Sequence, residues 1–187
     1  MKYAPFEPIK TEHLVLRKLR PEDAECYYHR IGGSEEVTRY MLWQPHQSLQ
    51  ESRESIKKVL TKYAAGNCYC WAIALAEDDS VIGRIDLLRF DEENDSCCFA
   101  YMLGKEFWGR GFGTEALKAV FSFAFKRMGM QQITADHMRE IPASGRVMQK
   151  SGMHHVQTLP AKYEKNGKQY DAEEYAITHE EWKYHQG

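Results

Sequence analysis

The sequence predicts an α+β fold, in which helices on both faces cover one mixed, mostly antiparallel sheet of six to seven strands. Segments of strand and helix character follow one another in the order β-α-α-β-β-β-α-β-α-β-β along the 187 residues. The strands expected at 69–76, 81–90 and 96–103 are joined by links short enough to allow only antiparallel pairing. The strand expected at 131–137 follows a helix and can run parallel to the strand before it. No repeat or linker interrupts the chain, so we expect one domain over residues 1–187.

The first part of the chain is expected to form one strand and then helices. Residues 13–19 alternate well enough to be a strand. Pro21 and the acidic residues after it favour the first turn of a helix, and a short helical segment follows at 34–41. Residues 48–51 have the pattern of a capping box, and the helix that they begin is expected to end at Gly66.

The second part supplies the remaining strands and two further helices. After the three antiparallel strands and the strand at 131–137, we expect the last two strands at 154–163 and 169–177, joined through an Asn-Gly hairpin turn. One helix begins near Gly113, carries its apolar residues on one face and ends at Gly129. The other helix begins at Pro142 and ends at Gly152.

Composition and charge limit the classes of function. A content of 43% hydrophobic and 28% charged residues is ordinary for a globular protein, and a net charge of -2 argues against a sequence-independent grip on nucleic acid. No signal peptide and no run of about 18 apolar residues is present, so we expect a cytoplasmic protein that does not bind membranes. Five cysteines, an odd number, fit reduced thiols better than a disulfide framework. A monomer and a homodimer are both open.

A glycine-rich stretch lies between the strand at 96–103 and the helix after it. Gly109, Gly111 and Gly113 alternate with other residues, and a glycine can take positive φ and bring the backbone close to a ligand. Free N–H groups at the start of a helix, together with the positive end of its dipole, attract phosphate. The stretch therefore predicts an anion site, and a turn without a ligand is the alternative.

Two nucleotide-binding motifs fit this stretch less well. Residues 111–116 satisfy the dinucleotide fingerprint G-x-G-x-x-A, and Asp136 lies at about the distance of its ribose-binding acid. However, residues 104–108 separate the strand from the loop, whereas the fingerprint turns at once, and repeated βαβ units are missing. A Walker loop is excluded because no Gly-Lys-Ser/Thr follows. A dinucleotide-dependent oxidoreductase is therefore disfavoured.

The order of the segments from the strand at 96–103 onward resembles the GNAT acetyltransferases. The glycine stretch is similar to that superfamily's Q/R-x-x-G-x-G/A pyrophosphate motif, with Trp108 where Gln or Arg usually stands. The resemblance covers roughly residues 10–180. Its similarity to the branch that acetylates the N-termini of ribosomal proteins lies in residues 14–17, 101–103, 107–109, 114–116 and 144–148.

The resemblance implies a GNAT fold whose fourth and fifth strands, ending at Leu103 and at about His137, splay apart. It implies transfer of an acetyl group from acetyl-CoA to a primary amine, in a protein N-terminus or a small molecule, directly in a ternary complex. The pantetheine arm would lie along Tyr101, Met102 and Leu103 as an added strand does. The pyrophosphate would meet the backbone N–H groups of Gly109, Arg110, Gly111, Phe112, Gly113 and Thr114. The Arg110 side chain either touches a phosphate or is solvated.

The chemistry needs a proton acceptor for the amine, donors for an oxyanion and an acid for the departing thiolate. The N–H of Met102 or Leu103 is the simplest oxyanion donor. Many family members protonate the thiolate with a tyrosine, but Met148 stands there. Ser144 matches a serine of the ribosomal-type branch and is the predicted general acid, with a first-turn serine that bonds backbone as the alternative. No base is evident: the candidates are His137, Asp136, Glu35 and Asp86, besides water or a small population of free amine.

Two further departures from the family pattern weaken the match. Cys98 stands where the branch often has glutamate, and Ile141 replaces the asparagine that caps the helix at Pro142. The missing cap should cost about 1 kcal/mol. A CoA-binding module without turnover is therefore the alternative function.

Acceptor-binding and metal-binding residues complete the expectations. By the resemblance, Tyr40, Trp43 and His46 wall the acceptor site, and a loop that merely packs on the sheet is the alternative. The cysteine and histidine pairs lack the spacing of a zinc site, so no metal is expected.

Overall fold

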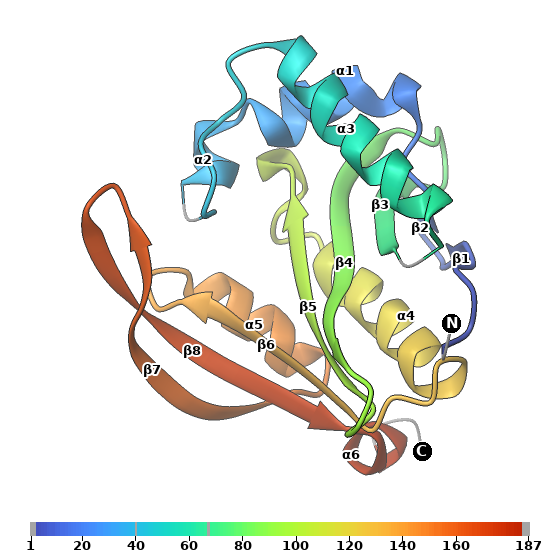
Figure 1. Ribbon diagram of the computed structural model, residues 1–187, viewed down its shortest axis with the longest axis vertical. Coiled ribbons are helices and arrows are strands. Elements are labelled where there is room, and N and C mark those ends of the chain that lie inside the picture. The colour runs from blue at the N-terminus through green and yellow to red at the C-terminus, as the bar shows by residue number, and fades with distance from the viewer. Residues whose placement is uncertain (1–2, 40, 67, 185–187) are drawn as a thin grey trace.

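The computed structural model describes residues 3–39, 41–66 and 68–184, and its strands form one mixed sheet (Figure 1). The order across the sheet is β1-β2-β3-β4-β5-β6-β8-β7, and all neighbours are antiparallel except β5 and β6. The strands are β1 (Ile9–Lys10), β2 (Leu14–Arg17), β3 (Tyr69–Leu75), β4 (Val81–Asp91), β5 (Ser96–Leu103), β6 (Gln132–Met138), β7 (His154–Lys165) and β8 (Lys168–Thr178). The α+β class is confirmed. The described strands number eight rather than six to seven, because β1 is too short to show a period.

Helices cover both faces of this sheet, as expected (Figure 1). They are α1 (Ala24–Tyr27), α2 (Glu35–Thr38), α3 (Leu49–Ala64), α4 (Phe112–Lys126), α5 (Pro142–Lys150) and α6 (His179–Tyr184), with short 3-10 or π turns at Pro21–Asp23, Tyr28–Gly32 and Lys105–Phe107. Half of the capping box before α3 is present: Ser48 Oγ accepts from the Glu51 N–H at 3.3 Å, but Glu51 Oε2 accepts from the N–H of Gln47, at 3.0 Å, instead of that of Ser48. Helix α6 was not expected, although Thr178 and Glu181 have the same pattern: Thr178 Oγ1 accepts from the Glu181 N–H at 3.3 Å.

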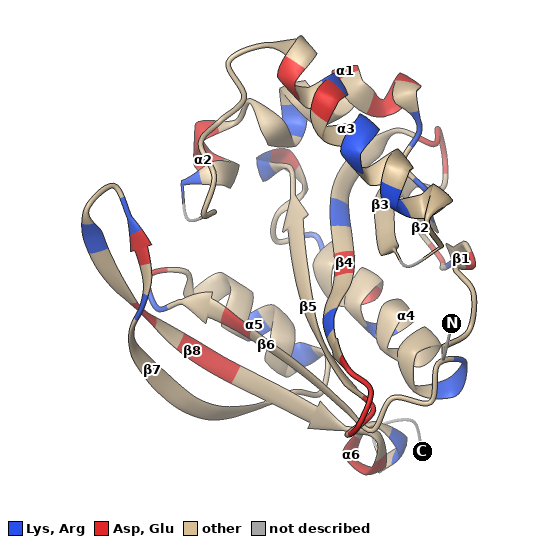
Figure 2. Ribbon diagram, viewed as in Figure 1, with Lys and Arg blue, Asp and Glu red and all other residues tan. Residues whose placement is uncertain are grey.

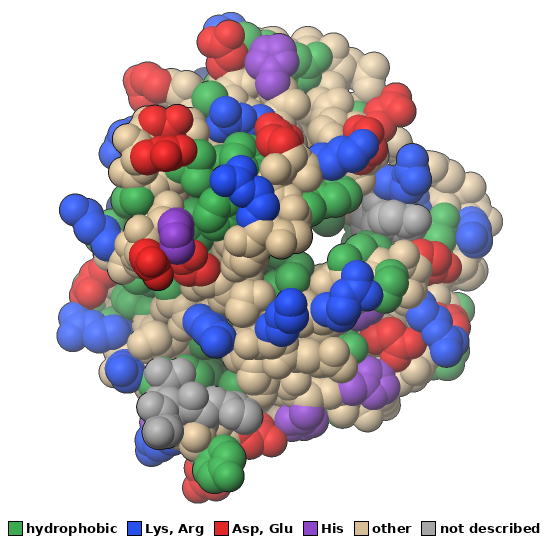
Figure 3. Space-filling model, turned by 180° about the vertical axis from the view of Figure 1, so that it is seen from behind, with side chains coloured by type: hydrophobic (Ala, Val, Ile, Leu, Met, Phe, Trp, Pro, Cys, Tyr) green, Lys and Arg blue, Asp and Glu red, His purple; other side chains and the backbone are tan. Residues whose placement is uncertain are grey.

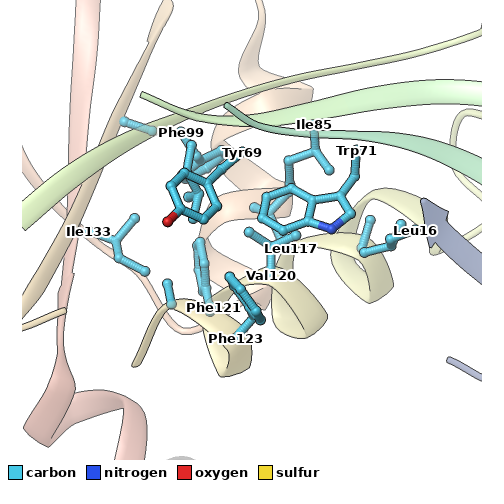
Figure 4. Packing of buried hydrophobic residues seen from close by; sticks show 14 of the residues in the cluster. Leu16, Tyr69, Trp71, Ile85, Phe99, Leu117, Val120, Phe121, Phe123 and Ile133 are labelled. Carbon is cyan, nitrogen blue, oxygen red and sulfur yellow. The ribbon is translucent and has the colours of Figure 1, made fainter. Parts of the chain in front are cut away.

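The core consists of two clusters, one on each face of the sheet. The larger cluster packs the apolar face of α4 against the sheet, with Trp71, Leu117 and Phe121 fully buried (Figure 4). The smaller cluster joins α1 and α3 to the opposite face, where Ala72 is fully buried. Trp71 and Ala72 are adjacent on β3 and serve different clusters, because successive strand residues point to opposite faces.

The parallel pair β5 and β6 diverges after three residue pairs. Ser96, Cys97 and Cys98 pair with Gln132, Ile133 and Thr134, and no pairing joins the later residues of the two strands. Strand β6 keeps its other partner, β8, along its whole length. The predicted splay between these strands is therefore confirmed, and it leaves the last part of β5 with an open edge (Figure 1).

The remaining expectations concern charge, thiols and membranes. Acidic and basic residues are interspersed over helices and strands (Figure 2). The five cysteines are free thiols, as expected. Among the described helices, none is long and apolar enough to cross a bilayer. The Asn-Gly turn is confirmed: Asn166 and Gly167 both have positive φ between β7 and β8.

Candidate functional site

The glycine loop turns from the end of β5 into α4 through two left-handed residues. Gly109 has φ +74° and Gly111, the N-cap of α4, has φ +89°. Apart from its chain neighbours and the backbone of its own helix, a Cβ added at either glycine would meet no atom of the described residues within 4 Å. The backbone here is therefore open to the outside, and a side chain is disfavoured by conformation rather than by crowding.

The backbone N–H groups of residues 109–114 are unpaired with protein. Within the described part of the chain, none of them donates a hydrogen bond to a backbone or side-chain acceptor. The first bond of α4 runs from the Glu115 N–H to the Gly111 carbonyl at 3.0 Å. A run of free donors at the positive end of a 15-residue helix is suited to a phosphate group.

A cavity of about 650 Å³ lies against this loop and the open end of β5. Figure 3 shows an opening between the upper and lower parts of the molecule, seen from behind. Eight of the predicted site residues line the cavity: Tyr101, Met102, Leu103, Gly109, Gly111, Gly113, Thr114 and Ser144. The fold thus brings together these eight residues, which come from β5, the glycine loop and α5 and were predicted to bind acetyl-CoA or act on it.

Two loop side chains lie outside this cavity, and one predicted residue is not described. The Phe112 side chain is buried in the larger core cluster. The Arg110 guanidinium lies over the rings of Phe112 and Phe107, at 4.9 and 5.8 Å from their centroids. Neither residue lines the cavity. Tyr40 falls outside the described residues.

The direction of the β5 amides decides which of them the cavity can use. The Gly104 N–H donates to the Ile82 carbonyl in β4 at 2.8 Å. Because amide direction alternates along a strand, Met102 also points its N–H and C=O at β4, whereas Tyr101 and Leu103 point theirs at the splay. The Leu103 carbonyl accepts from Trp108 Nε1 at 2.8 Å, which fixes the glycine loop to the end of β5. The Leu103 N–H, and not that of Met102, is therefore the donor aimed at the opening.

Helix α5 carries Ser144 into the cavity wall. Ser144 is half-buried in the first turn, and its side chain makes no hydrogen bond to backbone within the described residues. Burial raises the pKa of Tyr101, and a hydrogen bond with the Ser144 side chain opposes part of that rise. Ile141 is the N-cap of α5 and provides no side-chain cap. Met148, at the position where many family members have a tyrosine, is buried in the core.

A second cavity, of about 500 Å³, shares one lining residue, Met102, with the first. Two predicted acceptor residues, Trp43 and His46, line it. Asp86 was expected only as a candidate base, and its ion pair was not expected: Arg84 Nη2 lies 2.8 Å from Asp86 Oδ1, and both residues also line the cavity. The signal was present, since two opposite charges two residues apart share one face of an otherwise apolar strand.

The other candidate bases lie away from both cavities. His137 is buried and bonds the Met138 carbonyl through Nδ1 at 2.8 Å. Asp136 bonds Lys162 Nζ at 2.7 Å and the Tyr163 hydroxyl. Glu35 is an exposed residue at the start of α2. In the part of the chain that the structure covers, no three potential metal ligands gather.

Known proteins share this sequence pattern and fold. Residues 13–154 match the family model of the acetyltransferase (GNAT) domain. The uncharacterized N-acetyltransferase p20 of Bacillus licheniformis is 32% identical over 132 residues, which are 70% of this chain and 72% of that protein. The uncharacterized N-acetyltransferase YoaA of Bacillus subtilis is 26% identical over 92% of this chain and 97% of its own.

Further comparisons concern fold and acceptor. An acetyltransferase of the GNAT family from Bacillus anthracis has a TM-score of 0.82 at 22% identity, over 93% of this chain and 99% of that one. Spermidine N-acetyltransferase from Vibrio cholerae, solved with CoA and spermine, has a TM-score of 0.77 at 19% identity, over 92% and 99%. Such identities show the fold alone. YdaF of Bacillus subtilis, provisionally named a ribosomal N-acetyltransferase, is 27% identical over 66% of this chain and 68% of its own. The chain therefore belongs to the GNAT acetyltransferase family and is an acetyltransferase.

Proposed function

We propose that the protein moves an acetyl group from acetyl-CoA to a primary amine by direct transfer in a ternary complex. The observation that carries this proposal is the row of N–H groups at residues 109–114, which have no partner among the described residues and lie at a cavity lined by Gly109, Gly111, Gly113 and Thr114 together with residues 101–103 of β5. A diphosphate needs donors of this kind, and an extended amide-containing arm needs a strand edge.

The donor half of the site fits acetyl-CoA by its chemistry. Glycines at 109 and 111 leave the approach to the loop free of side chains. The backbone of Tyr101 and Leu103 offers the open strand edge, although the Leu103 carbonyl is already bonded to Trp108. Acetyl-CoA supplies the activated acetyl group when it is bound. The missing cap at Ile141 removes one polar contact from this half of the site.

The protein would stabilise charge at two points of the transfer. The free amine attacks the thioester carbonyl, and the Leu103 N–H is placed to donate to the oxygen that gains negative charge. When the C–S bond breaks, the thiolate needs a proton, which the Ser144 hydroxyl would supply from the cavity wall. The attacking nitrogen must lose one proton to become an amide, and that proton would restore the Ser144 hydroxyl, so the amide and CoA thiol are the products.

The second cavity would hold the acceptor. It is lined by Trp43 and His46 and shares the lining residue Met102, near the end of β5, with the donor cavity, so an amine held there would lie next to the strand that receives the pantetheine arm. The names of two similar proteins support two acceptor classes, a ribosomal protein and a polyamine. We propose a protein N-terminal α-amine or a small-molecule amine.

The test is release of CoA thiol from acetyl-CoA with a panel of peptides with free N-termini and of spermidine. We expect turnover with at least one amine. Ser144→Ala should lower kcat about 100-fold, the smaller end of what a general acid contributes, and leave the Kd for acetyl-CoA unchanged. The matched control is Ser151→Ala at the other end of α5, where Ser151 Oγ only donates to the Val147 carbonyl at 2.9 Å.

Two outcomes would count against the proposal. Tight binding of CoA without turnover of any amine would favour a CoA-binding module. Normal turnover by Ser144→Ala would remove Ser144 from the chemistry while leaving the transfer itself in place.

A further inference from the structure

His46 is held in one orientation between α2 and α3. Its backbone N–H donates to the Gly32 carbonyl at 2.8 Å, and its Nδ1 lies 2.7 Å from the hydroxyl of Ser52, a fully buried residue of α3. Its ring also packs between the rings of Trp43 and Tyr27, at centroid distances of 5.2 and 6.3 Å. A histidine that only covered a loop would not need a buried hydroxyl to fix its ring.

Gly32 makes room for this arrangement. A Cβ at Gly32 would lie 2.5 Å from His46 Nδ1 and 2.8 Å from Ser52 Oγ, distances that real contacts do not reach. The position of the ring therefore depends on a residue without a side chain. Backbone, hydroxyl and glycine together define where the imidazole lies.

The second ring nitrogen is the one left for chemistry. In the tautomer whose Nδ1–H donates to Ser52 Oγ, Nε2 carries the lone pair, and it has no hydrogen-bond partner among the described residues. His46 lines the second cavity together with Met102, the residue shared with the donor cavity. With the acceptor in this cavity, as proposed above, the imidazole lies beside the amine.

The cavity holds charges of both signs around the ring. The titratable side chains that line the cavity with His46 are Tyr27 of α1, Glu51, Glu54 and Lys58 of α3, and Arg84 and Asp86 of β4. Burial lowers the pKa of His46 below its usual value of 6.5, Glu51 raises it and Lys58 lowers it. At neutral pH the ring is therefore uncharged and able to accept a proton.

We propose that His46 Nε2 accepts the proton that the attacking ammonium must lose, directly or through one water. This inference rests on the proposed function. The ammonium gives one proton to His46, and the resulting amine forms the C–N bond while the C–S bond breaks. The second proton leaves the nitrogen as the thiolate is protonated, so one amide, one CoA thiol and one protonated His46 result. His46 then releases its proton to water.

The test compares His46→Gln with wild type on a short peptide with a free N-terminus, over a range of pH. A positioned base contributes about 10²- to 10⁴-fold, so kcat/KM should fall by at least 100-fold at pH 7. The acid limb of the wild-type profile should lie below pH 6.5, whereas in the variant it should move to the pKa of the free α-amine, about 8. Imidazole should partly restore His46→Ala. The matched control is His155→Gln, an exposed histidine bonded to Glu173 at 2.7 Å.

Two readouts do not depend on turnover. The Kd for acetyl-CoA should be the same in all variants, which shows that the fold is intact. Addition of the peptide to the CoA-bound protein should shift the NMR resonances of the His46 ring and not those of His155. If wild type releases no CoA with any amine, the proposed function and this inference both fail. If wild type is active and His46→Gln keeps its rate and its acid limb, only the inference is overturned.

Discussion

Replacement of Gly111 by valine tests whether the free amides of the glycine loop bind CoA. Gly111 has φ +89° and no protein atom near the position of a Cβ, so the substitution strains the backbone without a clash. Left-handed backbone costs a residue with a side chain about 2 kcal/mol. For a chain of 187 residues this lowers Tm by about 4–8 °C.

The expected effect on binding is larger than the effect on stability. Relaxation of φ would turn the N–H groups on either side of Gly111 away from a common point, and the new side chain would fill the approach. Each hydrogen bond to a charged group contributes about 1.5–3 kcal/mol, so the loss of two weakens CoA binding by about 10²- to 10⁴-fold. Titration calorimetry with CoA measures this directly.

Gly129 provides the matched control, because it has φ +75° and equally open surroundings just after the other end of α4. Gly129→Val should lower Tm by a similar amount and leave the Kd for CoA unchanged. If both variants weaken binding equally, or if Gly111→Val binds CoA normally, the loop amides do not hold the diphosphate.

Two further predictions concern the acceptor wall and pH. Lys165 Nζ donates to the carbonyls of Thr38 and Met41 at 2.8 and 2.6 Å, which ties the tip of the β7–β8 hairpin to the segment that leads to His46. Lys165→Met removes both bonds and should raise KM for the acceptor at least 10-fold, because even one charge-assisted bond contributes about 1.5–3 kcal/mol to holding this segment, with the Kd for acetyl-CoA unchanged in calorimetry. Burial raises the pKa of Glu115, but hydrogen bonds from Thr11 and His13 outweigh it and leave the pKa below the usual 4.5. The unfolded chain therefore binds more protons at this site, and the stabilisation is present above pH 4.5 and lost as pH falls through the lowered pKa. Glu115→Gln should flatten this part of the urea-stability profile, and an unchanged slope below pH 4.5 would contradict the assignment.

Local patterns were sufficient for the elements that form the donor half of the site. Alternation along β5, glycines at 109 and 111, and a proline at the start of α5 are short-range features, because turn conformation and helix caps depend on neighbouring residues. The capping box at Thr178 shows that even the unexpected α6 had a local signal. The two-residue β1 had none, since pairing with β2 alone defines it.

The acceptor half could be only partly foreseen. Trp43 and His46 were expected there through a family resemblance, but their partners come from distant segments: Ser52 and Gly32 around His46, and the Arg84–Asp86 pair across the cavity. No periodicity connects a loop, a helix and the middle of a strand. Such contacts depend on how the layers pack.

The sequence by itself determined the order of strands and helices, the left-handed glycine loop and the uncapped start of α5, because each depends on residues close together in the chain. The tertiary structure alone decided that the amides at 109–114 have no partner among the described residues, that Leu103 rather than Met102 points its N–H at the splay, and that Met102 lines two cavities. The physical reason is that these properties belong to pairs of segments. Whether an amide is free or bonded depends on what the fold brings opposite it.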